Sequence, residues 1–236
     1  MTRASLALLT AFILRPAPEA QAASTAPLAA SFVSSKEWKM RRSPVKEEEF
    51  TGEVRYWTYS RFVRADWALY RHDDETWEAR GNIRGEHTLP RGRGVFEVFG
   101  ERAVFDQKRR KGSLTGKRGY VDVVLTSADG FKDFGRAGRL AWELDRSASL
   151  LDGVRLWGER VDAWADRADY DWEKAALTLS GGRPVLHKKF GDWTAAVKAD
   201  TVTALDAAAQ SRHLRAQGRV RGWIEFRKYA GADLEP

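Results

Sequence analysis

The chain has 236 residues, 43% hydrophobic and 31% charged, so it can bury the core of one or two domains. It contains no cysteine, which excludes disulfides, zinc-thiolate sites and a thiol nucleophile. Its formal net charge of +7 favours anionic partners such as nucleic acid, anionic lipid head groups or phosphorylated glycolipid.

The first 22 residues have the pattern of a bacterial secretory signal peptide. Arg3 gives the start a positive charge, the run Ala4–Leu14 is uncharged, and Ala20-Gln21-Ala22 has the A-x-A form of a cleavage site. The uncharged run is shorter than the about 20 residues that span a bilayer. We therefore predict export and removal of residues 1–22, with an uncleaved membrane anchor as the alternative. Export makes nucleic acid the less favoured anionic partner, and we predict none.

Residues 23–50 have no clear hydrophobic period. An Ala/Ser/Pro-rich part is followed by the charged run Lys46–Glu49, which is typical of a linker or mobile arm. We predict a folded domain over residues 51–228 and a C-terminal tail over residues 229–236.

The folded region repeats one short element. Each copy has a small or acidic anchor, an aromatic residue four positions later, a polar turn, an apolar pair, and a glycine fifteen positions after the anchor. The anchor, aromatic and glycine positions are Asp66, Tyr70 and Gly81; Glu101, Phe105 and Gly116; Gly138, Trp142 and Gly153; and Asp166, Tyr170 and Gly181. A fifth, less regular copy has Asp200, Val202, Ala204 and a later Gly218.

Hydrophobic alternation in each copy predicts strands. Val161, Ala163 and Ala165 alternate in one phase, whereas Ala168 and Tyr170 continue in the other, so the apolar face switches at the anchor. A β-bulge or sharp bend produces such a slip, and an acidic anchor can accept hydrogen bonds from backbone N–H groups that the bend leaves unpaired. The sequence thus predicts an all-β fold of repeated bent hairpins, stacked as an antiparallel twisted jelly roll that is open at its ends.

One segment conflicts with this pattern. Residues 202–214 contain good helix formers, so local propensity alone predicts a helix there. The phase of the repeat favours strands, and a short helix remains the alternative.

The acidic residues Asp166, Asp169 and Asp171 are a candidate for general acid–base chemistry or metal binding. Acidic residues recur at the same phase in several copies, which favours a structural role. The four histidines lack metal-ligand spacing, and no nucleotide-binding or nucleophile motif is present; the histidines are His72, His87, His187 and His213. We therefore predict no catalytic residues, no metal and no cofactor.

Two further features permit several interpretations. The basic run Gln107–Gly112 falls at a predicted hairpin turn, so a solvated turn is favoured over a nucleic-acid patch. A set of aromatic residues is compatible with an ordinary core, a sugar-stacking surface, or a groove between sheet faces that holds acyl chains. These residues are Trp67, Tyr70, Trp77, Phe105, Trp142, Tyr170 and Trp172.

Four stretches between about Thr51 and Phe226 resemble the OstA-like domain of the periplasmic lipopolysaccharide-transport (Lpt) proteins of LptA and LptC type. They are "VRADWALY…ARGNIRG", "GERAVFD…GSLTG", "AWADRADYDWEKAALTLSGG" and "AVKADTVTALD". The resemblance implies a V-shaped jelly roll whose apolar interior carries lipopolysaccharide acyl chains. It also implies a periplasmic bridge between the two membranes, built by head-to-tail stacking and edge-strand addition with other Lpt components. The many Trp and Arg residues and the unusual third copy depart from the family.

We therefore expect a non-enzymatic carrier of lipopolysaccharide or a related anionic acyl lipid. A cleaved signal favours a soluble LptA-like role, and an uncleaved one favours an LptC-like component anchored in the inner membrane. The other interpretation is an envelope glycan-binding β-protein that uses exposed Trp residues. The predicted inward-facing, lipid-binding residues are Ala68, Tyr70, Ala103, Phe105, Leu140, Trp142, Ala168, Tyr170, Leu177, Leu179 and Val202.

Overall fold

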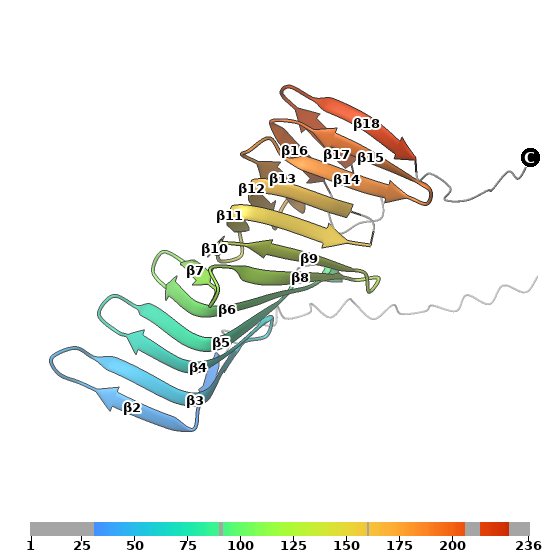
Figure 1. The fold of residues 1–236 in the computed structure, drawn as a ribbon. Helices are drawn as coiled ribbons and strands as arrows, with labels where there is room; N and C mark the ends of the chain where they lie inside the picture. The colour runs from blue at the N-terminus through green and yellow to red at the C-terminus, as the bar shows by residue number, and fades with distance from the viewer. Residues whose placement is uncertain (1–30, 90–91, 160, 206–212, 227–236) are drawn as a thin grey trace, which may run out of the picture. The chain divides into compact units, whose positions relative to one another are not determined.

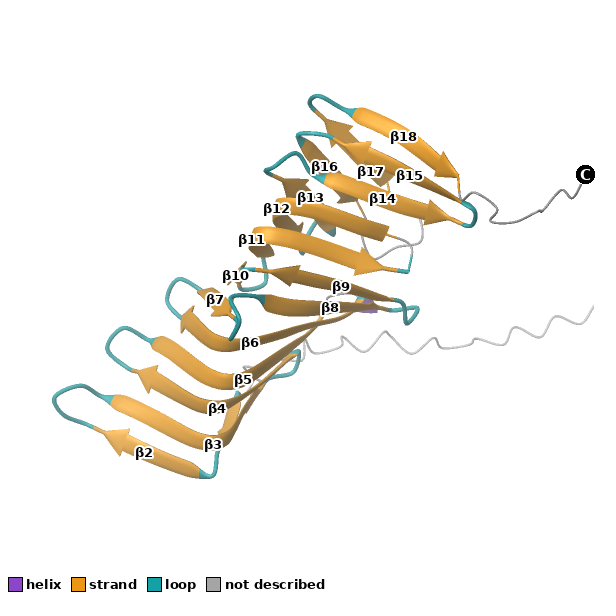
Figure 2. Ribbon diagram, in the orientation of Figure 1, coloured by secondary structure: helices purple, strands orange, loops and turns teal. Residues whose placement is uncertain are grey.

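The structure is a computed structural model that describes residues 31–226 except 90–91, 160 and 206–212. Figure 2 shows strands along nearly all of this region, joined by short loops. All pairings among them are antiparallel, as the alternation predicts. The strands are β1 (Phe32–Ser34), β2 (Glu37–Arg41), β3 (Glu47–Trp57), β4 (Arg61–Arg71), β5 (Thr76–Thr88), β6 (Gly94–Asp106), β7 (Lys111–Thr115), β8 (Val121–Ser127), β9 (Lys132–Ala137), β10 (Arg139–Glu143), β11 (Ser147–Gly158), β12 (Val161–Asp171), β13 (Ala176–Ser180), β14 (Val185–Phe190), β15 (Trp193–Lys198), β16 (Thr201–Leu205), β17 (His213–Gln217) and β18 (Arg221–Phe226).

The strands form two facing layers that stack in chain order (Figure 1). Layer A contains β2, β7, β10, β13, β16 and β17, and layer B contains β1, β8, β9, β14, β15 and β18. The longer strands β3, β4, β5, β6, β11 and β12 contribute one half to each layer. The predicted all-β fold of bent hairpins in an open jelly roll is thus confirmed.

The long strands bend at β-bulges. Gly52 and Glu53 on β3 together oppose Asp66 on β4, and residues 152–153 on β11 oppose Asp166 on β12. These bulged residues have positive φ angles, between 49° and 82°, which bend the strand sharply. The predicted phase slip is therefore a bulge, with the acidic anchor at the bend and the extra residue on the partner strand.

The anchor carboxylates bind side chains at these bends. The Asn82 side-chain amide donates to Asp66 over 2.7 Å, and Arg219 donates to Asp200 over 2.8 Å. The sequence predicts backbone N–H donors to the anchors. For these two anchors that prediction is wrong, because among the described residues their donors are side chains. The glycine fifteen positions after the anchor is required because a Cβ on Gly81, where φ is +78°, would lie 2.5 Å from an Asp66 oxygen.

Two sequence-based boundaries need correction. Residues 32–50, predicted as part of a linker, form β1, β2 and the start of β3, because β3 supplies pairing partners for both short strands. Residues 202–205 and 213–214 lie in β16 and β17, so the helix alternative is wrong there, and residues 206–212 lie outside the described part. The predicted signal peptide, residues 23–30 and the tail also lie outside it. Among the described residues, no helix is long and apolar enough to cross a membrane.

The two layers meet directly near the middle of the stack. Trp172, in the turn after β12, packs edge-on against His87 and Phe96, with ring centroids 5.6 and 5.8 Å apart. Arg61 at the start of β4 also forms an ion pair with Asp145 in the β10–β11 turn. Burial, together with the charge of Arg61, lowers the pKa of His87 below its ordinary value. A mostly uncharged imidazole at neutral pH suits this apolar contact.

Candidate functional site: an apolar interior between the layers

The inner face of layer A carries two continuous rows of paired residues. Strand register places the members of each row opposite one another on successive strands, about 4.8 Å apart. Inner row 1 runs Phe50, Ala68, Ala79, Ala103, Leu114, Leu140, Leu150, Ala168, Leu179, Val202 and Ala216. Inner row 2 runs Tyr70, Trp77, Phe105, Gly112, Trp142, Ala148, Tyr170, Leu177, Ala204 and Leu214. Both rows are apolar from β4 to β17.

The structure brings the residues predicted to face inward onto these two rows. Inner row 1 holds Ala68, Ala103, Leu140, Ala168, Leu179 and Val202, and inner row 2 holds Tyr70, Phe105, Trp142, Tyr170 and Leu177. They therefore share one face of one layer. Their contact with lipid stays a prediction.

An apolar cavity of about 230 Å³ lies between the layers in the part built from β8 to β17. The layer A wall of this cavity includes five predicted residues: Leu140, Ala168, Tyr170, Leu177 and Leu179. The volume is below the range of about 300–1,000 Å³ typical of pockets for drug-sized ligands. The cavity therefore accommodates a segment of an acyl chain rather than a whole multi-acyl lipid.

The other predicted residues do not line this cavity. Ala68 packs in a separate small cluster with Phe50 and Val54. Tyr70 stacks on Trp77 with ring centroids 4.6 Å apart. Aromatic contacts thus fill the interior between β3 and β6.

The remaining predicted residues extend this packing towards the cavity. Phe105 lies parallel to Trp142 at 6.4 Å, and Trp142 covers Gly112 so closely that a Cβ there would lie 2.2 Å from its ring. Ala103 packs against the main core, and Val202 is buried within it. The interior is therefore continuous in its apolar character but differs in how fully side chains fill it.

The predicted residues do not include the opposite wall of the cavity. Layer B supplies Val123, Leu125, Leu156, Ala163 and Leu186. The alternation of Val161 and Ala163 before the bend marks the same inner face, but we assigned only positions after the bend. Because the strand bends at the anchor, residues on both sides of the phase slip face the same interior.

The rim of the cavity combines aromatic and charged residues. Phe131 and Phe134, near the β8–β9 turn, remain 38% and 37% exposed. The charged lining residues have both signs: Lys132, Lys188, Asp129, Asp133 and Glu159. An apolar cavity with charged groups of both signs at its rim suits an amphiphile whose polar head stays at the rim, where the two lysines can pair with anionic groups.

Two residues of the acidic cluster at 166–171, Asp169 and Asp171, bind neighbouring groups of the fold. Asp169 accepts hydrogen bonds from Ser149 Oγ and Arg167 Nε over 2.6 and 2.7 Å, and Asp171 accepts one from the Lys174 backbone N–H. Burial alone would raise the pKa of Asp169, but Arg167 and Ser149 outweigh it and the pKa lies below its ordinary value. Among the described residues, no group of three His, Asp or Glu side chains is placed to hold a metal.

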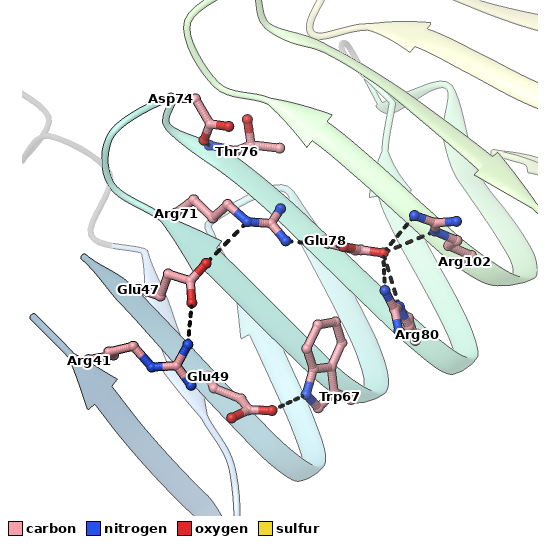
Figure 3. Close-up of polar contacts among 10 residues, drawn as sticks. All are labelled: Arg41, Glu47, Glu49, Trp67, Arg71, Asp74, Thr76, Glu78, Arg80 and Arg102. Atoms are coloured by element: carbon pink, nitrogen blue, oxygen red, sulfur yellow. Dashed lines mark hydrogen bonds and ion pairs between the residues drawn. The ribbon is translucent and has the colours of Figure 1, made fainter. Parts of the chain in front are cut away.

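A polar network covers the outer face of layer A on β2–β6 (Figure 3). Glu78 is only 5% exposed and lies within 2.8 and 2.9 Å of Arg80 and Arg102, and its other oxygen lies 3.7 Å from Arg71. Burial would raise the pKa of Glu78, but Arg80 and Arg102 outweigh it and the pKa is lowered. This network holds neighbouring strands together on the side opposite the apolar interior.

Trp67 belongs to this outer network rather than to the interior. Its indole donates to Glu49 over 2.7 Å, and the Arg80 guanidinium lies 4.9 Å from its ring (Figure 3). Of the aromatic residues singled out in the sequence, Trp67 is thus the one on the outer face of layer A, one position from inward-facing Ala68.

The basic run Gln107–Gly112 forms the β6–β7 turn and the start of β7, as its phase predicts. Its cations lie beside acidic residues: Arg110 is 2.6 Å from Asp145, and Arg109 is 3.6 Å from Asp106. The run is therefore a turn with locally balanced charge.

Comparisons with known proteins give little direct guidance. No family model and no curated protein matches the chain. One solved structure that matches is LptH, the LptA homologous periplasmic component of the conserved lipopolysaccharide transport device from Pseudomonas aeruginosa. The two chains are 9% identical with a TM-score of 0.33, and the match covers 65% of this chain and 84% of LptH. At this level of similarity the match carries no argument about function, which has to rest on the geometry of the interior.

Proposed function

We propose that this protein is a non-enzymatic carrier of lipopolysaccharide, or of a related anionic acyl glycolipid, in the bacterial periplasm. The observation that carries the proposal is the apolar interior, with its cavity of about 230 Å³ between two rows on layer A and a wall from layer B. The acyl chains occupy this interior, and the charged head stays at the rim beside Lys132 and Lys188.

The energetics of transfer support this role. An acyl chain in water costs about 25 cal/mol for each Å² of apolar surface that it exposes. Inner rows 1 and 2 continue across neighbouring strands at steps of about 4.8 Å, so a chain in the cavity between β8 and β17 can move from strand to strand in apolar surroundings. Between β3 and β6 the stacked rings have to move aside before a chain can pass. Such a path suits a carrier that passes lipid along its length.

The two ends of the stack support docking to other proteins. Among the described strands, β1 and β2 pair only with β3, while β17 and β18 pair only with β16 and β15. Strands with one free edge accept a further strand from a partner. We infer that other lipopolysaccharide-transport components, or a second copy of this chain, bind there.

The proposed position of the protein in the envelope depends on whether residues 1–22 are removed. Removal of this segment gives a soluble periplasmic carrier, which is the form we propose. Mass measurement of the secreted protein tests it, because an intact N-terminus in the membrane fraction would instead indicate an anchored component.

The lipid-binding role is tested by native mass spectrometry of the protein secreted from a Gram-negative host. We expect lipopolysaccharide or another acyl lipid to co-purify at stoichiometric level. The variant Leu177→Trp fills the cavity with an apolar ring, so it should remain folded and lose most of the bound lipid. Tyr170→Asp, which places a charge in the cavity wall, should also abolish loading.

A matched control separates this effect from a general one. Leu151→Trp adds the same ring on the outer face of layer A, between Arg139 and Arg167, and should load lipid normally. A lipid-free wild-type protein that also fails to take up added lipopolysaccharide would refute the proposal.

A further inference from the structure

One row on the outer face of layer B combines three cations with an exposed tryptophan. Its five members lie opposite one another in register on β11, β12, β14, β15 and β18, and they are Arg155, Trp164, Val185, Lys198 and Arg221. Steps of about 4.8 Å make the row about 19 Å long. We call these five residues the cationic stripe. It lies on the side of layer B that faces away from the cavity, because the neighbouring Ala163 faces inward.

Within the described residues, the cations of this stripe have no acidic partners. Arg155, Lys198 and Arg221 form no ion pair with any residue in the described part of the chain, although nearby Arg136 and Lys189 pair with Asp122 and Asp162. Lys198 and Arg221 also lie directly opposite each other, an arrangement that destabilises a sheet. Stability of the fold therefore does not account for the stripe.

A groove of about 390 Å³ lies along the stripe. Its lining includes three members of the stripe, Arg155, Trp164 and Lys198, and also Arg183 and Asp166. Trp164 is 40% exposed, and the Arg155 guanidinium lies 5.9 Å from its ring. The groove thus combines an open aromatic surface, cations and one acceptor.

The groove is open because of a glycine. In the first repeat the position after the bend glycine is Asn82, whose amide binds the anchor Asp66 over 2.7 Å. The corresponding residue near Asp166 is Gly182, where even a Cβ would lie 2.8 Å from an Asp166 oxygen. The side chain that covers the anchor in one repeat is therefore missing in the other, which leaves the Asp166 carboxylate at the groove.

We propose that this groove and stripe bind a linear acidic polysaccharide. Cations repeated on successive strands complement negative charges repeated along a chain. An exposed indole packs against the apolar face of a sugar ring, and a carboxylate accepts hydrogen bonds from sugar hydroxyls. Each polar or aromatic side chain of the groove thus has a matching group on the ligand.

Other polyanions fit the groove less well. Asp166 repels the closely spaced charges of a polyphosphate or nucleic-acid backbone, which offer it no donors. A flat anionic bilayer would contact the rim of the groove but would leave Asp166 unused. The combination of Trp164 and Asp166 therefore selects for a sugar rather than for charge alone.

The test is binding of a fluorescently labelled oligogalacturonate to the full secreted chain, followed by fluorescence anisotropy at low salt. We expect saturable binding that weakens as salt rises. The double variant Arg155→Gln/Lys198→Gln should reduce affinity by about tenfold or more. Trp164→Ala should reduce affinity for the oligogalacturonate by about fivefold and leave weak binding of linear polyphosphate unchanged.

The matched control is Arg109→Gln/Lys174→Gln, which removes the same charge from two turns of layer A, where the side chains are 81% and 73% exposed. It should bind as the wild type does. The proposal is refuted if the wild type fails to bind, if both double variants weaken binding equally, or if polyphosphate or phosphatidylglycerol vesicles depend on Trp164 as strongly as the oligogalacturonate does.

This inference is independent of lipid transport. The stripe variants should load lipid as the wild type does, because the stripe and the cavity lie on opposite faces of layer B. Loss of polysaccharide binding with normal lipid loading would therefore refute only the polysaccharide proposal. A lipid-free protein that binds oligogalacturonate would refute only the proposed carrier role.

Discussion

The interior has two regions built from the same repeat that differ in how side chains fill them. Between β3 and β6, inner row 1 has small residues such as Ala68 and Ala79, and inner row 2 has Tyr70 and Trp77, whose rings stack and occupy the space. Between β8 and β17, inner row 1 includes Leu140, Leu150 and Leu179, whereas inner row 2 includes Ala148, and a cavity remains. The repeat thus sets the register of the rows, and side-chain volume at each position decides whether the interior is filled or hollow.

The outer faces differ as well. The first region is covered on layer A by the network around Glu78, in which each described Arg has an acidic partner. The second region exposes Arg155 and Lys198 on layer B with no such partner in the described chain. The first region is therefore stabilised on layer A by ion pairs and filled within, while the second has a cavity within and, on layer B, cations with no acidic partner among the described residues.

The largest expected effect comes from an aromatic side-chain contact between the two regions. Trp172 is 9% exposed and packs against His87 and Phe96. Trp172→Ala should lower the free energy of unfolding by about 3–5 kcal/mol, because a buried ring is lost and a space remains. Urea denaturation measures this, with Trp38→Ala, at a position 57% exposed, as the control. A loss below about 1 kcal/mol would mean that this contact adds little to the strand pairing that joins the two regions through β6, β7 and β8.

The repeat determines which parts of the fold and of the candidate site can be predicted from the sequence. The fixed spacing from Asp66 to Tyr70 and from Asp166 to Tyr170 located the bends, the strands and the inward residues of layer A. Residues 32–50 lack that spacing, so nothing local distinguished β1 and β2 from a linker; β3 determines their pairing. The cavity was beyond prediction because it depends on volumes contributed by strands far apart in the chain.

A smaller effect is expected from the outer network of the first region. Glu78→Gln should lower the free energy of unfolding at pH 7 by about 1–3 kcal/mol, because a nearly buried carboxylate loses its charged partners Arg80 and Arg102. The pKa of Glu78 is lowered in the fold, so its stabilisation is complete above its unfolded value of about 4.5 and is lost as the pH falls through the lower folded value.

The pH dependence provides the check on this prediction. Urea denaturation of wild type and Glu78→Gln across this range should show the difference between them shrinking as the pH falls. A constant difference would show that the charge of Glu78 does not stabilise the first region, and would weaken the contrast between the two outer faces.

The smallest effect tests the contrast between the filled and hollow interiors directly. Ala148→Leu adds volume beside the cavity, and Ala103→Leu adds the same volume to inner row 1 where Ala79 and Leu114 already pack. Overpacking typically costs about 1–3 kcal/mol, so Ala103→Leu should destabilise the fold by that amount, whereas Ala148→Leu should change stability by less than about 1 kcal/mol. Native mass spectrometry should then show less bound lipid, or lipids with shorter chains, only in Ala148→Leu. Equal destabilisation by both variants would mean that the second region is as tightly packed as the first, and acyl chains would then need a rearrangement of the layers to enter.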